Sequence, residues 1–266
     1  STTVPSGSFA VHCGTLLTGD GTDPQNNVWL VVRNGKIESV GKTEPPADLA
    51  VVDARNKVVM PGIVAVDSDL APAADSQYQI TPDAFAIDAF DFERSWRRAL
   101  EGGITSAYLS PGRQRLIAGQ GAVVKLAGTD IVARVLNEEA ALRVNFGDGA
   151  LKAPRVFEPT AHPTDEDPLE AARIQLPTSR ISLLAELRAI FASATDKNRG
   201  PSGEGPAEHQ YDEDALRAVI AGKLPMRVGA TSTYDIRRAL QLQKELGIRM
   251  VLEDPRELAP IAATAA

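Results

Sequence analysis

The stretch Lys57-Val58-Val59-Met60-Pro61-Gly62-Ile63-Val64-Ala65-Val66 marks the point where the chain changes character. Before the Pro-Gly pair, short apolar segments alternate with turn residues, which is typical of a small sheet or sandwich. Directly after it, residues 63–66 form a continuous apolar run, as expected of a strand that is buried on both faces. The sequence therefore predicts a small β domain over residues 1–60 and an α/β domain over residues 61–266.

Upstream of this point, the strongest local signal is the pair Asn34-Gly35 between two apolar runs. Both residues tolerate positive φ, so the pair predicts a hairpin between strands at residues 27–33 and 37–41. Further short strands are predicted over residues 9–12, 14–17, 50–53 and 57–60.

Downstream, the apolar run at 63–66, a helical pattern over 85–102 and an apolar run at 104–109 predict a strand, a helix and a second strand. This βαβ order indicates a parallel sheet. Residues 147–177 are rich in Pro, Asp, Glu and Thr, and are predicted to form a long exposed excursion. The remaining predicted elements are a strand at 119–126, helices at 181–194, 212–221 and 233–246, a loop at 196–211, and strands at 226–228 and 248–252.

Charge and composition exclude several classes of function. The chain of 266 residues has a formal net charge of -7, which argues against nonspecific binding to nucleic acid. We find no apolar run near the roughly 20 residues that span a bilayer, so we expect a soluble protein. The single cysteine, Cys13, excludes a disulfide within the chain. The first residue, Ser1, fits a cytoplasmic chain and equally a periplasmic one that has lost a signal peptide.

Several ordered motifs resemble the amidohydrolase superfamily. Residues 14–21, 34–37 and 59–62 resemble its amino-terminal β-sandwich, in which a Pro-Gly pair leads into the first strand of a (β/α)₈ barrel. The motifs that resemble the imidazolonepropionase-related branch are Gly103-Ile104-Thr105, Leu109-Ser110-Pro111-Gly112, residues 116–125, residues 224–228 and residues 235–240. The resemblance implies a small β-sandwich-like domain followed by an incomplete (β/α)₈ TIM-type barrel of four to six strands.

The chain departs from the family pattern at the metal ligands. Where family members place a His-x-His pair after the first barrel strand, this chain has Asp67-Ser68-Asp69. Two further family histidines correspond to Gly229 and Thr231, and a position after residues 251–253 corresponds to Asp254. The histidines of this chain are His12, His162 and His209, none of which lies at a matching strand end. The resemblance therefore implies a degenerate member that lacks the metal-binding histidines.

Five residues remain as candidates for a site. Asp67 and Asp69 project the same way from a strand end, so they are candidate ligands for a hard cation such as Mg²⁺ or Ca²⁺. The resemblance implies Asp254 as a further candidate metal ligand. The alternative is a decayed histidine pair at a polar barrel mouth. Arg113 and Arg115 follow another strand end, where an anionic substrate is commonly held, although solvated loop arginines are also common there. We expect no cofactor; the alternative is a divalent cation, zinc by family resemblance. No catalytic residue is assigned.

Two functions follow from these expectations. A barrel needs eight strands to close, and an incomplete one leaves exposed edges. We therefore expect another polypeptide to complete the barrel, in a homo- or hetero-oligomer. The first hypothesis is a catalytically silent amidohydrolase-like subunit that supports or completes a partner, such as an active amidohydrolase. The alternative is a metal-dependent hydrolase of non-peptide C–N bonds, in cyclic or linear amides, with an altered metal site or residues supplied by a partner.

Overall fold

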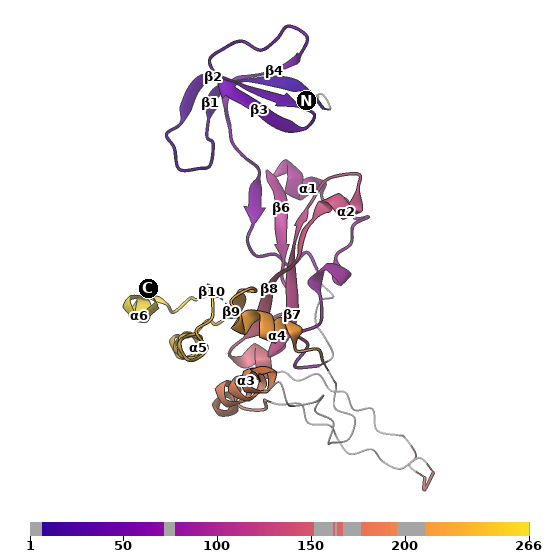
Figure 1. The fold of residues 1–266 in the computed structure, drawn as a ribbon, viewed down its shortest axis with the longest axis vertical. Coiled ribbons are helices and arrows are strands. Elements are labelled where there is room, and N and C mark those ends of the chain that lie inside the picture. Colours follow the sequence, from indigo (N-terminus) through magenta and orange to yellow (C-terminus); the bar gives the residue numbers. More distant parts are fainter. Residues whose placement is uncertain are drawn as a thin grey trace. The chain divides into compact units, whose positions relative to one another are not determined.

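The computed structural model describes residues 7–71, 78–151, 162, 164–166, 177–195 and 211–265 (Figure 1). Contacts within the chain divide it into two compact units, Ser1–Ile63 and Val64–Ala266. Most of the predicted excursion at 147–177 and most of the predicted loop at 196–211 lie outside the described residues. No helix among the described residues is long and apolar enough to cross a membrane.

The first unit is a four-stranded sheet in the order β3-β2-β1-β4. Its strands are β1 (Phe9–Leu16), β2 (Gln25–Arg33), β3 (Lys36–Gly41) and β4 (Ala50–Val59). The hairpin between β2 and β3 is confirmed, with positive φ of 50° at Asn34 and 74° at Gly35. The two short strands predicted over 50–53 and 57–60 are instead one strand, β4, which runs parallel to β1.

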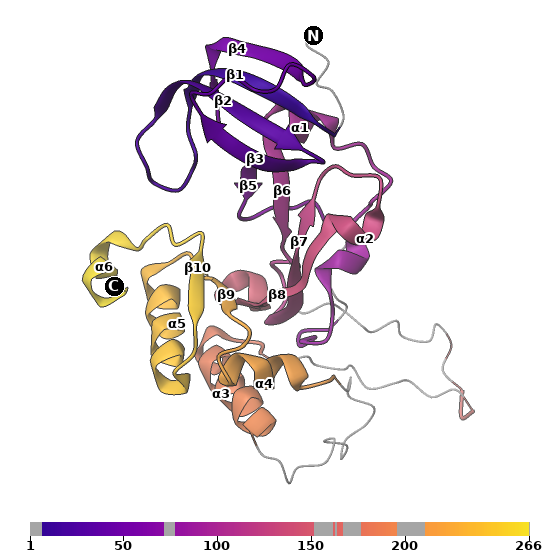
Figure 2. The same ribbon diagram turned by 45° about the horizontal axis from the view of Figure 1, so that its top comes forward.

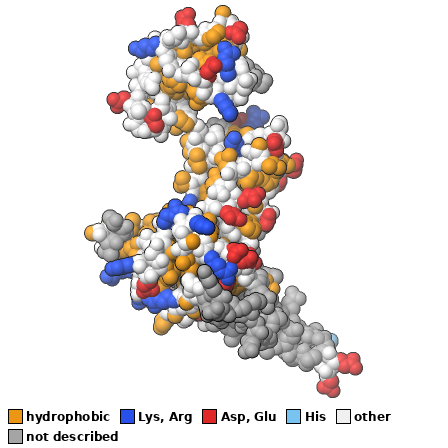
Figure 3. All heavy atoms as spheres, in the orientation of Figure 1, with side chains coloured by type: hydrophobic (Ala, Val, Ile, Leu, Met, Phe, Trp, Pro, Cys, Tyr) orange, Lys and Arg blue, Asp and Glu red, His pale blue; other side chains and the backbone are white. Residues whose placement is uncertain are grey.

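This sheet carries apolar side chains on both of its faces. Ala10 and Val31 pack on one face, and Cys13 and Val28 pack on the opposite one, because side chains alternate along a strand. Figure 3 shows apolar side chains at the surface of this unit, where Ile37 is 67% exposed. The predicted sandwich requires a second sheet, whereas the described residues of this unit form one.

The second unit contains a six-stranded sheet in the order β10-β9-β8-β7-β6-β5. The strands are β5 (Ile63–Ala65), β6 (Ile104–Leu109), β7 (Ile117–Lys125), β8 (Val135–Asn145), β9 (Met226–Gly229) and β10 (Met250–Glu253). Strands β8, β9 and β10 are mutually parallel, whereas β7 is antiparallel to both β6 and β8. This mixed α/β arrangement is consistent with part of a TIM-type barrel.

Helices cover one face of this sheet. The longest are α3 (Arg180–Thr195) and α5 (Thr233–Leu246), with the shorter α4 (Asp214–Ile220) beside α3 (Figure 2). The α5 helix ends at Gly247, whose φ of 63° confirms the predicted glycine stop. The remaining short helices are α1 (Arg97–Glu101), α2 (Ile131–Arg134), α6 (Ala262–Ala265), η1 (Ala86–Ala89), η2 (Asp148–Leu151) and η3 (Ala259–Ile261).

The apolar core lies between these helices and the outer face of the sheet. Leu187 and Phe191 of α3 and Ile236 of α5 pack with strand residues such as Leu142 and Met226, all of them fully buried. Because strand side chains alternate, the neighbouring positions on β8, β9 and β10 face the other way. We call this other side the inner face of the sheet.

The predicted helix over residues 85–102 is wrong as a single element, since η1 and α1 are separate. Two interactions hold the intervening chain out of a helix. The carboxylate of Asp91 accepts hydrogen bonds from the backbone N–H groups of Glu93 and Arg94, a local turn that competes with helical pairing. The rings of Phe90 and Trp96 stack at 5.3 Å across this turn, within a second apolar cluster.

Candidate functional site

The inner face of the sheet carries a buried ionic network near the carboxyl ends of three parallel strands. Arg143 of β8 and Arg227 of β9 both form ion pairs with Glu253 of β10. The side chains of Arg143 and Glu253 are only 2% and 4% exposed. Arg227 also lies over the ring of Tyr108, 4.0 Å from its centroid, and its Nη2 donates a hydrogen bond to the backbone oxygen of Val66 at 2.6 Å. The network therefore connects β6, β8, β9 and β10 with the segment that directly follows β5.

A glycine makes space for this network. A Cβ atom at Gly229 would lie 2.6 Å from Nη2 of Arg143 and 2.8 Å from Oδ1 of Asn145. Asn145 holds the guanidinium in this position, because its Oδ1 accepts a hydrogen bond from Nε of Arg143 at 2.8 Å. The amide nitrogen of Asn145 donates to the backbone oxygens of Gly112 and Arg115, which anchors the loop after β6. A larger residue at position 229 would displace the guanidinium.

Burial sets the protonation of two groups on this face. It lowers the pKa of Arg143 to about 10, with the nearby positive charge of Arg113 as a further cause. Arg143 is therefore still charged at neutral pH. Burial also raises the pKa of Tyr108 to about 12. Within the described part of the chain, the hydroxyl of Tyr108 has no hydrogen-bond partner and lies against the backbone of Gly121.

The structure brings together three of the five candidate residues. Asp67 and Asp69 follow β5, and both approach the guanidinium of Arg113: Nη2 is 2.7 Å from Oδ2 of Asp67 and 3.5 Å from Oδ1 of Asp69. Between them, Ser68 points to β6 and donates to the backbone oxygen of Tyr108 at 2.6 Å. The alternation of side chains thus makes the two carboxylates converge on one point, where a guanidinium lies.

The other two candidates lie in different surroundings. Asp254 has a φ of 51° and pairs with Arg256 at 2.8 Å, and the hydrogen bond from Arg256 lowers the pKa of Asp254. The charge of Arg113 contributes a smaller lowering. Arg115 donates from Nη1 to the backbone oxygen of Gln114 at 2.9 Å. Substrate contact by Arg113 or Arg115 stays a prediction.

The donor set at the strand ends does not fit a zinc ion. Among the residues that the structure describes, no three His, Cys, Asp or Glu side chains come close enough to share a metal. Guanidinium groups occupy the space beside Gly229 and the space between Asp67 and Asp69. A divalent cation would meet repulsion from these charges, which is strong where water is excluded. His12 lies in the first unit, where it stacks on Trp29, and His209 lies outside the described residues.

The ionic network can hold the strands of the sheet together. Both oxygens of Glu253 lie against guanidinium groups, Oε2 against Arg143 and Oε1 against Arg227, so this carboxylate is occupied by ion pairs within the sheet. A buried ion pair of this kind fixes one arrangement of strands, and removal of one partner leaves an uncompensated charge.

The residues of this network are not among the five candidates that the sequence pattern indicated. Strand β8 was not predicted, and with it Arg143 and Asn145 were missed. The signal was nevertheless present: in residues 142–145, apolar and polar side chains alternate with a period of two, as they do around Arg227 between Met226 and Val228. A long polar side chain between apolar neighbours on a parallel strand indicates that polar groups pack on the inner face of the sheet.

Comparison with known proteins shows the fold. No family model matches the sequence, and no curated protein matches it either. Among solved structures, the amidohydrolase from Thermotoga maritima MSB8 is similar with a TM-score of 0.79 and 24% sequence identity, over 97% of this chain and 67% of that chain.

Two further solved structures are much less similar. They are the zinc-containing N-acyl-D-glutamate deacylase from Bordetella bronchiseptica (TM-score 0.41, 17% identity, 98% of this chain and 55% of that chain) and the L-hydantoinase from Arthrobacter aurescens (TM-score 0.33, 16% identity, 92% of this chain and 52% of that chain). The likeness to the Thermotoga protein alone shows the fold: this chain has the fold of that structure, over about two thirds of its length.

Proposed function

We propose that this chain is a catalytically silent amidohydrolase-like subunit that supports or completes a partner chain. The observation that carries the proposal is the guanidinium of Arg143 beside Gly229, held by Glu253 and Asn145. The resemblance places metal-binding histidines at this strand end. Here a fixed positive charge takes the space instead, so the metal chemistry of the fold lacks its ligands.

The two sheets support the part of the proposal that concerns a partner. The first unit has apolar side chains on both faces of one sheet, and a sheet of this kind gains stability when a second layer covers it. Among the residues that the structure describes, β10 is an edge strand of the sheet of the second unit, and its Val251 is 48% exposed. A closed barrel needs eight strands, so further strands beside β10 and β5 would bury such residues. We propose that a partner polypeptide supplies them.

One observation favours the alternative, a metal-dependent hydrolase of non-peptide C–N bonds. Asp67 and Asp69 do converge, and carboxylates are suitable ligands for a hard divalent cation. For such a cation to bind, Arg113 would have to leave the pair, and a partner chain would have to supply the remaining ligands.

Native mass spectrometry of the protein purified from its source tests both functions. The silent-subunit proposal expects a complex that contains a second copy or a second polypeptide, with no metal on this chain. Hydrolysis assays with a hydantoin, an N-acyl amino acid and a linear amide, with and without added Zn²⁺ or Mg²⁺, should then show turnover only where a partner is active.

Two outcomes would contradict the proposal. A divalent ion bound in stoichiometric amount to this chain, with turnover that Asp67→Ala or Asp69→Ala abolishes, would establish the hydrolase instead. A single longer polypeptide that is monomeric would show that no partner completes the fold. The variant Glu101→Ala, at an exposed ion pair on α1, is a control for nonspecific effects of charge removal.

A further inference from the structure

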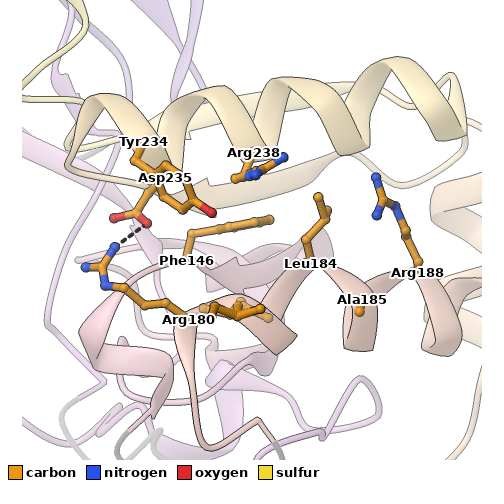
Figure 4. Close-up of a pocket in the computed structure, with 10 residues that line it drawn as sticks. Phe146, Arg180, Leu184, Ala185, Arg188, Tyr234, Asp235 and Arg238 are labelled. Carbon is orange, nitrogen blue, oxygen red and sulfur yellow. Dashed lines mark hydrogen bonds and ion pairs between the residues drawn. The ribbon is translucent and has the colours of Figure 1, made fainter.

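A small cavity lies between α3 and α5, on the helical side of the second unit and away from the inner face of its sheet. It has a volume of about 160 Å³. Figure 4 shows Tyr234 and Arg238 of α5 on one side, Leu184, Ala185 and Arg188 of α3 on the other, and the ring of Phe146 between them. The ionic network described above does not reach it, so its occupant is a separate question.

The floor of the cavity is apolar and buried, whereas its edge is charged and open to solvent. Phe146, Leu183 and Leu184 are 8%, 3% and 7% exposed, which places them in the core that joins the two helices to the sheet. An apolar cavity of about 150 Å³ is large enough for a benzene ring. Ala185 lines the cavity from an exposed position on α3, and Ile181 and Tyr234 lie at its edge with exposures of 90% and 49%.

Three arginines border the cavity, and two of them already have carboxylate partners. Arg180 binds Asp235 at 2.7 Å and Asp148 at 3.0 Å. Arg188 binds both oxygens of Glu245, at 2.7 and 2.6 Å. Their charges are therefore compensated, and their geometry is fixed by these pairs.

The third arginine, Arg238, differs from the other two. Its Nη1 donates to the neutral amide oxygen of Gln241 at 2.8 Å, and its guanidinium lies over the ring of Tyr234 at 5.0 Å. In the described part of the chain it forms no ion pair with a carboxylate. A guanidinium has five N–H donors, so most of its donors remain open to a ligand at the edge of the cavity.

We propose that this cavity binds a small aromatic carboxylate. The ring of the ligand packs against Phe146 and Leu184, and its carboxylate accepts hydrogen bonds from Arg238 at the edge. Ligand sites of this kind combine apolar walls with a few polar groups that fix orientation. The size of the cavity limits the ligand to about one six-membered ring with its carboxylate.

The test uses benzoate as the probe and benzyl alcohol as its neutral counterpart. The intact chain is titrated with each while the methyl signals of Leu183 and Leu184 are followed by NMR. We expect saturable binding of benzoate with a Kd on the order of 1 mM, as suits a ligand of this size, and weaker binding of benzyl alcohol. Arg238→Gln should weaken benzoate about tenfold, because a charge-assisted pair is lost, and should leave benzyl alcohol unchanged.

Matched variants separate the cavity from the helix surface. Ala185→Leu fills the cavity and should weaken both probes at least about tenfold, because the ring loses its space. Ala189→Leu, at an exposed position one turn later on α3, should leave both unchanged. Arg237→Gln, an equal loss of charge at an exposed position of α5 outside the cavity, should also leave both unchanged.

The results that would overturn the proposal are equally definite. Benzoate binding that is absent, or that survives Ala185→Leu, removes the cavity as its site. Equal binding of benzyl alcohol and benzoate, or an Arg237→Gln effect as large as that of Arg238→Gln, removes the carboxylate contact. Equal melting temperatures of the variants show that each change acts on binding and leaves folding intact.

Discussion

The two faces of β8, β9 and β10 are both buried, but different interactions stabilise them. On the outer face, Leu142, Met226 and Val228 are fully buried against helices by apolar contact, which tolerates changes that conserve volume. On the inner face, Arg143 and Glu253 are almost as deeply buried but are held by charge. A buried charge needs an opposite charge beside it. Removal of one member of the network should therefore cause a large loss in the free energy of unfolding.

The largest effect is expected for Glu253→Ala. This change leaves the buried guanidinium of Arg143 and that of Arg227 without their shared carboxylate, at a cost of about 3–5 kcal/mol in the free energy of unfolding. Urea unfolding at pH 7 measures it. Glu245→Ala, which breaks an exposed ion pair with Arg188, is the matched control and should cost no more than about 1 kcal/mol.

Replacement of the whole network sharpens the same comparison. The triple variant Arg143→Met, Arg227→Met and Glu253→Leu removes both signs of charge together, and should be far more stable than Glu253→Ala, within about 2 kcal/mol of the parent protein. If the triple variant were less stable than Glu253→Ala, the cost of Glu253→Ala would not arise from unpaired buried charges.

The second effect is expected for Gly229→Ala. The added Cβ would lie 2.6 Å from Arg143 Nη2, so the guanidinium must move away from Glu253, at a cost of about 2–3 kcal/mol. Thermal unfolding measures the loss. Gly41→Ala is the control, because a Cβ at that position meets nothing within 4 Å. Equal effects of the two changes would show that position 229 has no special role.

The third effect concerns Tyr108, whose buried hydroxyl has no hydrogen-bond partner among the residues that the structure describes. Tyr108→Phe removes this group and should raise the free energy of unfolding by about 1 kcal/mol at pH 7. The folded-state pKa of Tyr108 is raised to about 12, so the folded state binds more protons than the unfolded state above pH 10. The parent protein therefore loses stability between pH 10 and pH 12 through this group, and Tyr108→Phe does not.

The difference in unfolding free energy between the two proteins reports the titration of Tyr108 together with its coupling to Arg143. The pKa of Arg143 is lowered, so its effect on stability has the opposite sign: stability rises with pH above about pH 10. Both proteins retain Arg143, but Tyr108→Phe also removes the charge of ionised Tyr108, which raises the pKa of Arg143 in the parent protein. A difference in unfolding free energy that stays constant from pH 9 to pH 12 would contradict the raised pKa of Tyr108.

The sequence alone could predict features that depend on neighbouring residues. The hairpin at Asn34-Gly35 and the end of α5 at Gly247 depend on positive φ, which a few residue types indicate. Convergence of Asp67 and Asp69 depends on strand alternation and was predicted in the same way. Strand alternation does not indicate which residue pairs with the two carboxylates. That residue, Arg113, follows a different strand.

Features that depend on distant residues could not be predicted. Strand β8 is exposed over residues 136–139 and buried only over 141–145, so it lacks a uniform pattern. The pairing of Arg143 with Glu253 requires the order of β8, β9 and β10 in the sheet, which depends on how the whole unit folds. The predicted helix at 85–102 failed for a related reason, since the stacking of Phe90 on Trp96 competes with helical propensity.

The smallest effect is expected for the ion pair between Asp67 and Arg113, which lies at the edge of the inner face and is partly exposed. The side chains of Asp67 and Arg113 are 31% and 41% exposed, and pairs of this kind contribute about 0–1 kcal/mol. Asp67→Asn should therefore change urea unfolding by less than about 1 kcal/mol, although its geometry resembles that of the pairs around Glu253. A loss as large as that of Glu253→Ala would mean that this ion pair is also buried, as it would be if a partner covered it. Comparison of the purified chain with its native complex distinguishes these cases, because only in the complex should the loss then be large.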